Sequence, residues 1–191
     1  MGVVVRLRGR SCNRQVGILV SEPCLWLTGH ERVLPRTGDA LDVACGRGRH
    51  AFWMAARGLR TRAIDADQAA IAFVNARAAT RELPLRAEVV DLEGGSFRLE
   101  TASCDLIVGV HYLHRPLFPS LVEALRSGGV LVYETFTRAQ ATRGTPTNPD
   151  FLLEPGELRG LVDGLDVLAY REGDYDGRFV ASVIARRPRV T

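Results

Sequence analysis

Lysine is absent from this sequence: all 25 of its basic residues are arginine. Because the arginines are spread along the whole chain, we interpret their number as a compositional bias. Set against 22 acidic residues, they leave a net charge of +3. A charge this small does not indicate a nucleic acid as the partner.

Long apolar runs and metal-type cysteine spacings are also missing. No apolar run approaches the roughly 20 residues that cross a bilayer, so we expect no membrane partner. The arginine-rich segment 1–20 has only the short apolar run 16–20, which is less than the apolar core of about 7–15 residues in a signal peptide. An organelle-targeting arm is the less favoured alternative. The four cysteines lack metal-ligand spacing, so we predict no metal site and a reducing, cytoplasmic location.

The 191 residues suggest one main domain over 38–191, preceded by an extension over 1–37 that contains a short lid helix within Pro23–Leu34. Apolar runs predict strands at 40–45, 60–65, 86–90, 104–110, 129–136, 165–171 and 179–186. Helical spacing predicts helices at 49–58, 68–80 and 117–127. Asp67 is a suitable N-cap for the second helix, and Gly128 with Gly129 ends the third.

Strands that alternate with helices indicate a parallel sheet covered by helices on both faces. The last two strands are separated only by residues 172–178, too few for a crossover helix, so they pair as an antiparallel hairpin. The predicted fold is therefore α/β: a doubly wound, Rossmann-like, seven-stranded and mostly parallel sheet with a C-terminal antiparallel hairpin.

The most informative motif is a glycine turn between the first strand and the first helix. Gly46 and Gly48 permit close backbone approach to a ligand, and Asp65 ends the next strand nineteen residues after Gly46. A carboxylate at that spacing suits two ribose hydroxyls, which predicts a nucleoside-containing cofactor. The turn also satisfies a loose dinucleotide fingerprint. Asp42 within the strand, the C-terminal hairpin and the short chain favour S-adenosylmethionine over NAD.

At this point the sequence resembles the class I S-adenosylmethionine-dependent methyltransferases over residues 38–187. Segments 45–50, 112–117 and 133–136 are similar to small bacterial enzymes related to the tellurite-resistance methyltransferases. The resemblance implies S-adenosyl-L-methionine as cofactor. It also implies that Asp65 binds the ribose and that Asp91 and Leu92 meet the adenine.

The candidate cofactor-binding residues lie on the glycine turn and at the strand ends: Asp42, Ala44, Cys45, Gly46, Gly48, Arg49, Asp65, Ala66, Asp91, Leu92 and Val110. A buried carboxylate needs partners, so we expect Asp42 to order the glycine turn or the methionine end of the ligand. Arg49 either pairs with the methionine carboxylate or forms a surface salt bridge.

The candidate catalytic residues follow the fourth strand, where ligands bind in open α/β sheets: His111, Tyr112, His114 and Arg115. They could act as a base, orient a nucleophile or hold an anion. Alternatively, the histidines satisfy backbone groups and Arg115 pairs with an acid. Tyr133 and Glu134 are weaker candidates. A metal site from His111, His114 and Glu134 is not expected, because methyl transfer needs no metal.

We therefore predict a methyltransferase acting on a small-molecule acceptor, with a thiol or a soft oxyanion such as tellurite as candidates. The long segment 137–154 is expected to close over the acceptor. No Asp-Pro-Pro-Tyr, Asn-Pro-Pro-Tyr or Pro-Cys motif indicates nucleobase methylation. The alternatives are a non-catalytic S-adenosylmethionine-binding sensor or partner domain and, less favoured, a small NAD(P)-dependent reductase. The sequence predicts no oligomeric state.

Overall fold

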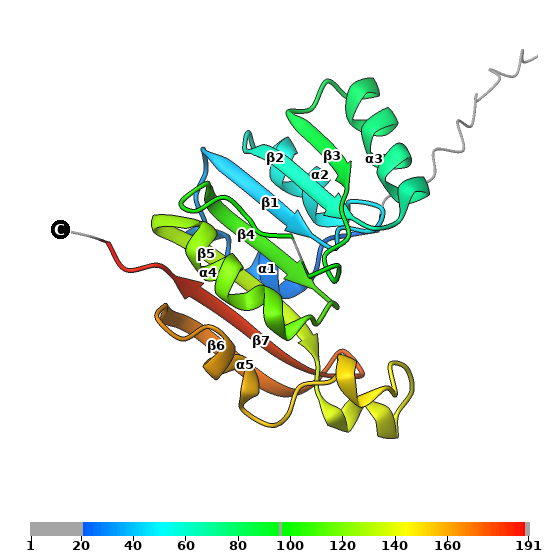
Figure 1. The fold of residues 1–191 in the computed structure, drawn as a ribbon, viewed down its shortest axis with the longest axis vertical. Coiled ribbons are helices and arrows are strands. Elements are labelled where there is room, and N and C mark those ends of the chain that lie inside the picture. The colour runs from blue at the N-terminus through cyan, green and yellow to red at the C-terminus, as the bar shows by residue number, and fades with distance from the viewer. Residues whose placement is uncertain (1–20, 96, 190–191) are drawn as a thin grey trace, which may run out of the picture.

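A single twisted sheet forms the centre of the computed structural model, which describes residues 21–95 and 97–189 (Figure 1). Within these residues the sheet has seven strands in the order β3-β2-β1-β4-β5-β7-β6. Their bounds are β1 Asp39–Val43, β2 Arg60–Asp65, β3 Leu85–Val89, β4 Cys104–Val110, β5 Leu125–Phe136, β6 Asp166–Tyr175 and β7 Arg178–Arg186.

The first five strands pair in parallel, and β7 runs antiparallel to both of its neighbours, β5 and β6. The predicted sheet with its C-terminal hairpin is confirmed. Since β1 and β4 are adjacent although distant in sequence, the chain reverses its winding there. A cleft therefore opens at the carboxyl ends of these two strands, where ligands of open α/β sheets bind.

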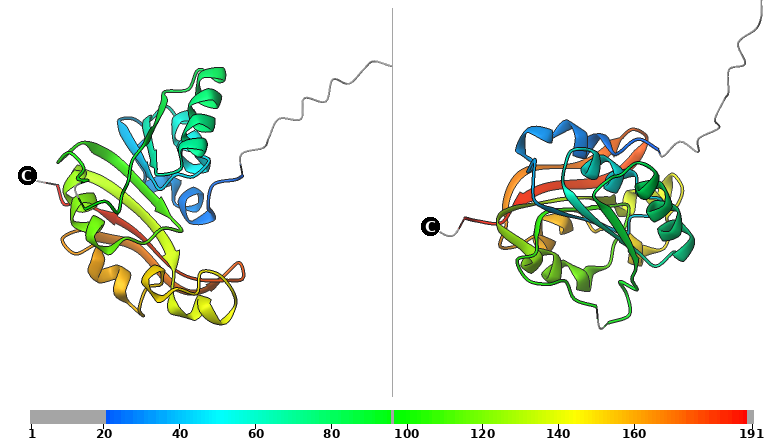
Figure 2. Two further views of the ribbon diagram at one scale, coloured as in Figure 1. Left: turned by 45° about the vertical axis from the view of Figure 1, so that its right-hand side comes forward. Right: turned by 90° about the horizontal axis from the view of Figure 1, so that it is seen from above.

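Helices cover both faces of the sheet (Figure 2). One face carries α1 (Leu25–Gly29), α2 (Arg49–Ala56) and α3 (Gln68–Thr80), and the other carries α4 (Phe118–Ala124) and α5 (Glu157–Leu161). Four short 3₁₀ helices join them: η1 Glu31–Val33, η2 Arg115–Leu117, η3 Arg138–Thr142 and η4 Pro149–Phe151. No helix within the described residues has the length and apolar character needed to span a membrane.

Helix α3 begins and ends where the sequence predicts. The Asp67 side chain accepts hydrogen bonds from the backbone N–H groups of Ala69 and Ala70, at 2.8 and 3.1 Å. This N-cap satisfies amides that have no partner inside the helix. It also fixes the start of α3 directly after the end of β2, beside the glycine turn.

The predicted helix over 117–127 is wrong at its C-terminal end. Helix α4 stops at Ala124, and β5 already begins at Leu125, four residues before the predicted strand. The cause is tertiary: the carbonyl of Ala124 accepts the backbone N–H of Ser103, and Arg126 forms ion pairs with Asp39 and Asp105. These contacts draw the chain into the sheet, although its local pattern permits another helical turn.

The chain before β1 packs into the sheet rather than forming a separate extension. The helix predicted within Pro23–Leu34 is present as α1 and η1, and Trp26 and Leu27 join a buried cluster with Val108 of β4. The packing therefore shows no break at residue 37, because these side chains supply the apolar cover for the centre of the sheet. Residues 1–20 of the predicted extension lie outside the described residues.

The sequence pattern misses α5 and two short helices within the segment 137–154. That segment contains η3 and η4, and its ends are joined by a bridge between Thr137 and Leu153. The side chain of Gln140 accepts the backbone N–H of Phe179 and donates to the carbonyl of Thr145. These bonds hold the segment against the hairpin end of the sheet.

Candidate functional site

The turn between β1 and α2 is an elbow with left-handed backbone at Ala44, Gly46 and Gly48 (φ 51°, 51° and 76°). Its amide at Gly46 donates to Oδ2 of Asp65 at 2.7 Å, which ties the elbow to the end of β2. A Cβ at Gly48 would come within 2.9 Å of a Val74 methyl carbon. Glycine is therefore required at Gly48 by both conformation and space.

Asp42 lies beneath this elbow and is only 1% exposed. Its Oδ2 accepts the backbone N–H of Ala51 in the first turn of α2, at 2.8 Å, whereas Oδ1 has no hydrogen-bond partner among the described residues. Burial raises the pKa of the Asp42 carboxyl to about 7. This geometry agrees with the expected role of Asp42 in ordering the glycine turn, because its carboxyl group accepts a backbone N–H from the first turn of α2.

His50 connects the elbow to the segment before β1. Its Nε2 accepts the backbone N–H of Cys24 at 3.4 Å, and its Nδ1 lies 3.8 Å from Oδ1 of Asp42. Burial, together with the charge of Arg49 and neighbouring His111, lowers the pKa of His50 to about 3. The imidazole is therefore neutral at pH 7, and its contact with Asp42 is not an ion pair at that pH.

The buried His50 gives the first prediction, which concerns stability. A histidine that is neutral in the fold but has a pKa near 6.5 when unfolded stabilises the protein fully above pH 6.5. That contribution is lost as the pH falls from 6.5 towards 3, by up to about 1.4 kcal/mol per pH unit. In urea titrations between pH 4 and 8, His50→Asn should remove this loss, so its deficit in unfolding free energy relative to the parent chain narrows as the pH falls.

Asp42 acts in the opposite direction, since its raised pKa makes the folded state bind a proton as the pH falls below 7. The unfolding free energies of His50→Asn and the parent chain must therefore be compared with each other at each pH. His30→Asn serves as the control, because His30 lies away from the contact between His50 and Asp42. A His50→Asn deficit that stays constant from pH 8 to pH 4 would contradict the prediction.

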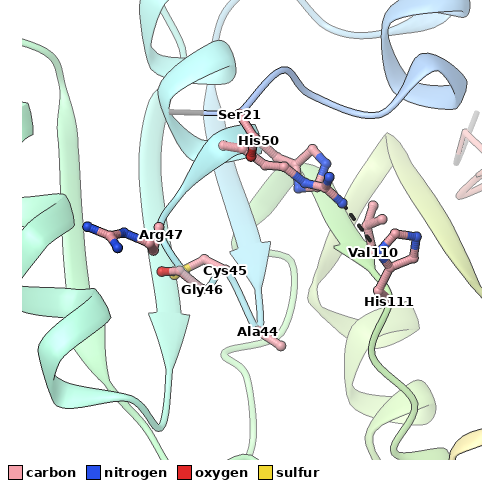
Figure 3. A pocket seen from close by; sticks show the side chains of 9 residues that line it. Ser21, Ala44, Cys45, Gly46, Arg47, His50, Val110 and His111 are labelled. Atoms are coloured by element: carbon pink, nitrogen blue, oxygen red, sulfur yellow. Dashed lines mark hydrogen bonds between the residues drawn. The ribbon is translucent and has the colours of Figure 1, made fainter. Parts of the chain in front are cut away.

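Two cavities meet at the elbow. The first, of about 350 Å³, contains five predicted cofactor residues and runs toward His111 (Figure 3); it is lined by Ser21, Ala44, Cys45, Gly46, Arg47, Arg49, His50, Val110 and His111. The second, of about 400 Å³, lies at the ends of β2 and β3 and is lined by Ala44, Asp65, Ala66, Asp91, Leu92, Glu93 and Tyr112. Ala44 borders both, so together they form one groove across the strand ends.

The second cavity has the hydrogen-bond acceptors that the hydroxyl groups of a nucleoside require. The Asp65 carboxylate accepts the amides of Gly46 and Asp67 at 2.7 and 2.9 Å, which fixes it at the cavity wall with further lone pairs free for hydroxyl groups. Asp91 is held similarly by the amide of Glu93 at 2.9 Å. Leu92 supplies an apolar surface beside them. The residues present therefore fit a ribose and an adenine.

His111 stands where the groove leaves the elbow and crosses to β4. Its backbone is left-handed (φ 62°), its N–H donates to the carbonyl of Glu134, and its ring stacks on Phe136 at 4.6 Å. Arg49 reaches the Nδ1 atom of His111 at 3.5 Å. Burial and the charges of Arg49 and Arg178 lower the pKa of His111 to about 4. This strained position holds a neutral imidazole at the end of the cofactor groove.

Tyr112 is positioned from beneath by the next strand. The buried Tyr133 hydroxyl donates to the Tyr112 carbonyl at 2.9 Å, and only a glycine at Gly109 leaves room for the Tyr133 ring. The Tyr112 hydroxyl is itself buried with no hydrogen-bond partner among the described residues. Burial and nearby Glu93 raise the pKa of Tyr112. Its hydroxyl is therefore protonated at pH 7.

The structure does not bring Arg115 and His114 to the groove. Arg115 forms a bidentate pair with Glu157, at 2.5 and 2.9 Å, and donates to the carbonyls of Asp150 and Leu152. The alternative, an arginine paired with an acid, is the one that the structure shows. His114 precedes η2 and lines neither of the two cavities. The Arg115 guanidinium therefore anchors the segment 137–154 and lines neither of the two cavities.

Glu134 is also committed to structural partners. Its carboxylate accepts from Arg171 at 2.9 Å and from the Ser182 hydroxyl at 2.6 Å. Among the described residues, no three histidine, cysteine or acidic side chains form a group able to hold a metal ion.

Sequence reasoning misses several side chains that reach the groove from remote segments. Arg171 and Arg178 of the C-terminal hairpin approach His111, as do Glu22 and Cys24, around a smaller cavity of about 170 Å³. For Arg171 and Arg178, the signal in the sequence is the hairpin itself, whose turn lies at the carboxyl end of β5. Local patterns do not show which cavity these residues border.

The comparisons with known proteins agree with this geometry. Residues 40–129 match the protein family described as "Methyltransferase domain". This stretch, just under half of the chain, is therefore similar to a methyltransferase domain. The match covers the elbow, both carboxylate-bearing strand ends and the His111 corner, so it includes every residue that lines the groove except Ser21. The predicted resemblance to a methyltransferase is confirmed over this range.

Solved methyltransferases share the fold of this domain. The chain is similar to an S-adenosylmethionine-dependent methyltransferase from Mesorhizobium loti, with 18% identity, a TM-score of 0.67 and coverage of 86% of this chain and 98% of that one. TehB from Haemophilus influenzae gives 20% identity and a TM-score of 0.67 over 85% of this chain and 61% of that one. At these identities the likeness establishes the fold alone.

A curated relative extends beyond the methyltransferase domain. "Hemagglutinin 1" of Eikenella corrodens is 28% identical in an alignment 138 residues long, which covers 69% of this chain and 45% of that protein. The chain therefore spans less than half the length of that relative.

Proposed function

We propose that this chain uses S-adenosylmethionine to methylate a small-molecule acceptor that binds beside His111. The observation that supports this most directly is the continuous groove across Ala44. Its second cavity presents Asp65 and Asp91, and its first cavity runs past Arg49 to a neutral imidazole. A thiol and a soft oxyanion such as tellurite are the candidate acceptors, and the proposed setting is the cytoplasm.

Each part of the groove has a distinct role in this proposal. When bound, S-adenosylmethionine supplies a methyl group that is already activated by its sulfonium charge. Asp65 and Asp91 hold the nucleoside, and Arg49 faces the carboxylate of the methionine end. His111 accepts a proton from the acceptor and, with Phe136, fixes its approach. Such alignment can lower a barrier by about 7–11 kcal/mol.

The buried Asp42 supports this cofactor over a dinucleotide. A pyrophosphate bound at the elbow would need the free amides at the start of α2. The Ala51 amide is already occupied by the Asp42 carboxyl at 2.8 Å. A pyrophosphate at the elbow would find the Ala51 amide already hydrogen-bonded to Asp42. Above pH 7 it would also be repelled by the negative charge of the Asp42 carboxylate.

Calorimetry with S-adenosylhomocysteine and NAD tests the proposal. We expect S-adenosylhomocysteine to bind at least about 100-fold more tightly than NAD, because its ribose reaches Asp65 without placing a pyrophosphate over Asp42. Release of S-adenosylhomocysteine from S-adenosylmethionine in the presence of a thiol and oxyanion panel would then establish turnover. Tighter binding of NAD would contradict the cofactor assignment, whereas cofactor binding without turnover on the panel would favour the sensor alternative.

A further inference from the structure

A third cavity, of about 460 Å³, adjoins the groove on the side of β5. Its lining is dominated by rings and aliphatic groups: Glu93, His111, Tyr112, Leu113, Thr135, Phe136, Thr145, Pro146 and Phe151. This volume lies in the range of sites for small organic ligands, about 300–1,000 Å³. It is larger than a compact oxyanion requires.

The position of this cavity suits an acceptor. It shares His111 with the methionine side of the groove, and it shares Tyr112 and Glu93 with the nucleoside side. A molecule in the cavity therefore borders both halves of the bound cofactor. Its nucleophilic atom can reach the junction of the two halves beside the His111 imidazole.

The segment 137–154 forms the outer wall and is held firmly. Arg115 binds the carbonyls of Asp150 and Leu152 on either side of Phe151, and Gln140 binds the carbonyl of Thr145. Phe151 is nevertheless 46% exposed. A large apolar side chain held at a cavity in this way gains stabilisation when an apolar ligand covers it.

The smaller cavity on the other side of His111, which Arg171 and Arg178 border, is a poorer acceptor site. At about 170 Å³ it is smaller, and its three arginines face three acids, which are Glu22, Glu134 and Asp176. Arg171 is also committed to Glu134 and Ser182 and lies against the rings of Trp26 and Tyr175. This cavity therefore has little net attraction for an anionic acceptor.

We propose that the acceptor is an apolar thiol whose hydrocarbon body, aromatic or branched, occupies the third cavity between Phe136 and Phe151. This inference rests on the proposed function and names the acceptor class for the same site. A thiol suits a weakly basic imidazole, because its ordinary pKa near 8.5 is lower than that of a phenol near 10. The apolar body of the acceptor follows from the ring and aliphatic side chains that line the third cavity.

The chemical step balances with the groups present. The thiol proton passes to the His111 imidazole and then to solvent. The acceptor sulfur forms a bond to the methyl carbon as the bond between that carbon and the sulfonium breaks, and the released electron pair stays on the sulfur that leaves. The products are a methyl thioether and S-adenosylhomocysteine, and no oxidant or reductant is needed.

Two thiols of similar acidity test the inference with the full chain: phenylmethanethiol, which carries an apolar ring, and 2-mercaptoethanol, which does not. We expect kcat/KM for phenylmethanethiol to be at least about tenfold higher, from burial of its ring. Phe151→Ala should reduce that preference by about fivefold to tenfold through KM, while turnover of 2-mercaptoethanol changes by less than about twofold. Arg178→Gln, in the smaller cavity on the other side of His111, is the matched control and should leave the preference between the two thiols intact.

Calorimetry supplies a readout that does not depend on turnover. In the presence of S-adenosylhomocysteine, benzyl methyl sulfide should bind the parent chain more tightly than it binds Phe151→Ala. Equal kcat/KM values for the two thiols, or selenite turnover that Arg178→Gln abolishes, would overturn the inference and leave the proposed function standing. Failure of S-adenosylhomocysteine to bind would overturn both.

Discussion

Asp65→Ala is expected to weaken S-adenosylhomocysteine binding by at least about 100-fold while the chain stays folded. Each charge-assisted hydrogen bond to a ribose hydroxyl is worth about 1.5–3 kcal/mol, and we expect two of them. The carboxylate also holds the Gly46 amide at 2.7 Å, so its loss loosens the elbow as well as removing the acceptor groups. Isothermal titration calorimetry gives the affinity, and circular dichroism checks the fold.

Asp67→Ala provides the matched control for this prediction. Asp67 lies two residues further along, and its carboxylate caps α3 without lining the groove. Its substitution should lower the free energy of unfolding by about 1 kcal/mol with little change in affinity. If Asp65→Ala binds S-adenosylhomocysteine as tightly as the parent chain does, the cofactor site is misassigned.

His111→Asn is expected to reduce kcat for a thiol acceptor by about 100-fold or more, with S-adenosylhomocysteine affinity within about threefold of the parent chain. A positioned proton acceptor typically contributes about 10²–10⁴-fold. Asparagine tolerates the left-handed backbone at this position (φ 62°), so the substitution removes the imidazole without adding strain. Steady-state kinetics with saturating cofactor measure the effect.

The pH profile distinguishes a proton acceptor from a merely structural histidine. With the pKa of His111 lowered to about 4, the imidazole is already neutral above pH 5, so the parent chain should show no activity inflection near pH 6.5. Activity should fall only as the pH approaches 4. His114→Asn serves as the comparison at the same corner; an equal loss of kcat in that variant would contradict the assignment to His111.

The difference between His111 and Arg115 shows what a local motif leaves open. Both residues belong to one polar run after β4, and the sequence alone assigns them to the same acceptor corner. In the fold, the run turns at His111 because Tyr133 holds the Tyr112 carbonyl from below. Arg115 then points toward Glu157 of α5, a helix that the sequence pattern does not predict. A partner forty-two residues away decided its role.

Similarly, the positions of Asp42 and Asp65 were predictable because they depend on short-range geometry. A strand, a glycine turn and a helix N-terminus place Asp42 below the elbow, and the next parallel strand places Asp65 beside it. By contrast, the end of the third predicted helix depended on ion pairs between Arg126, Asp39 and Asp105, which only the assembled sheet brings together. Local propensity has no access to such contacts.

The sequence alone determined the order of strands and helices, the antiparallel hairpin and the glycine elbow, because hydrophobic periodicity and glycine geometry act over a few residues. Only the tertiary structure decided which side chains line the cavity that we propose for the acceptor. Phe136, Phe151 and Tyr112 come from three separate segments, and their shared cavity exists because the chain from 137 to 154 folds back onto His111. Contacts between distant segments depend on the packing of the whole sheet, which no local pattern encodes.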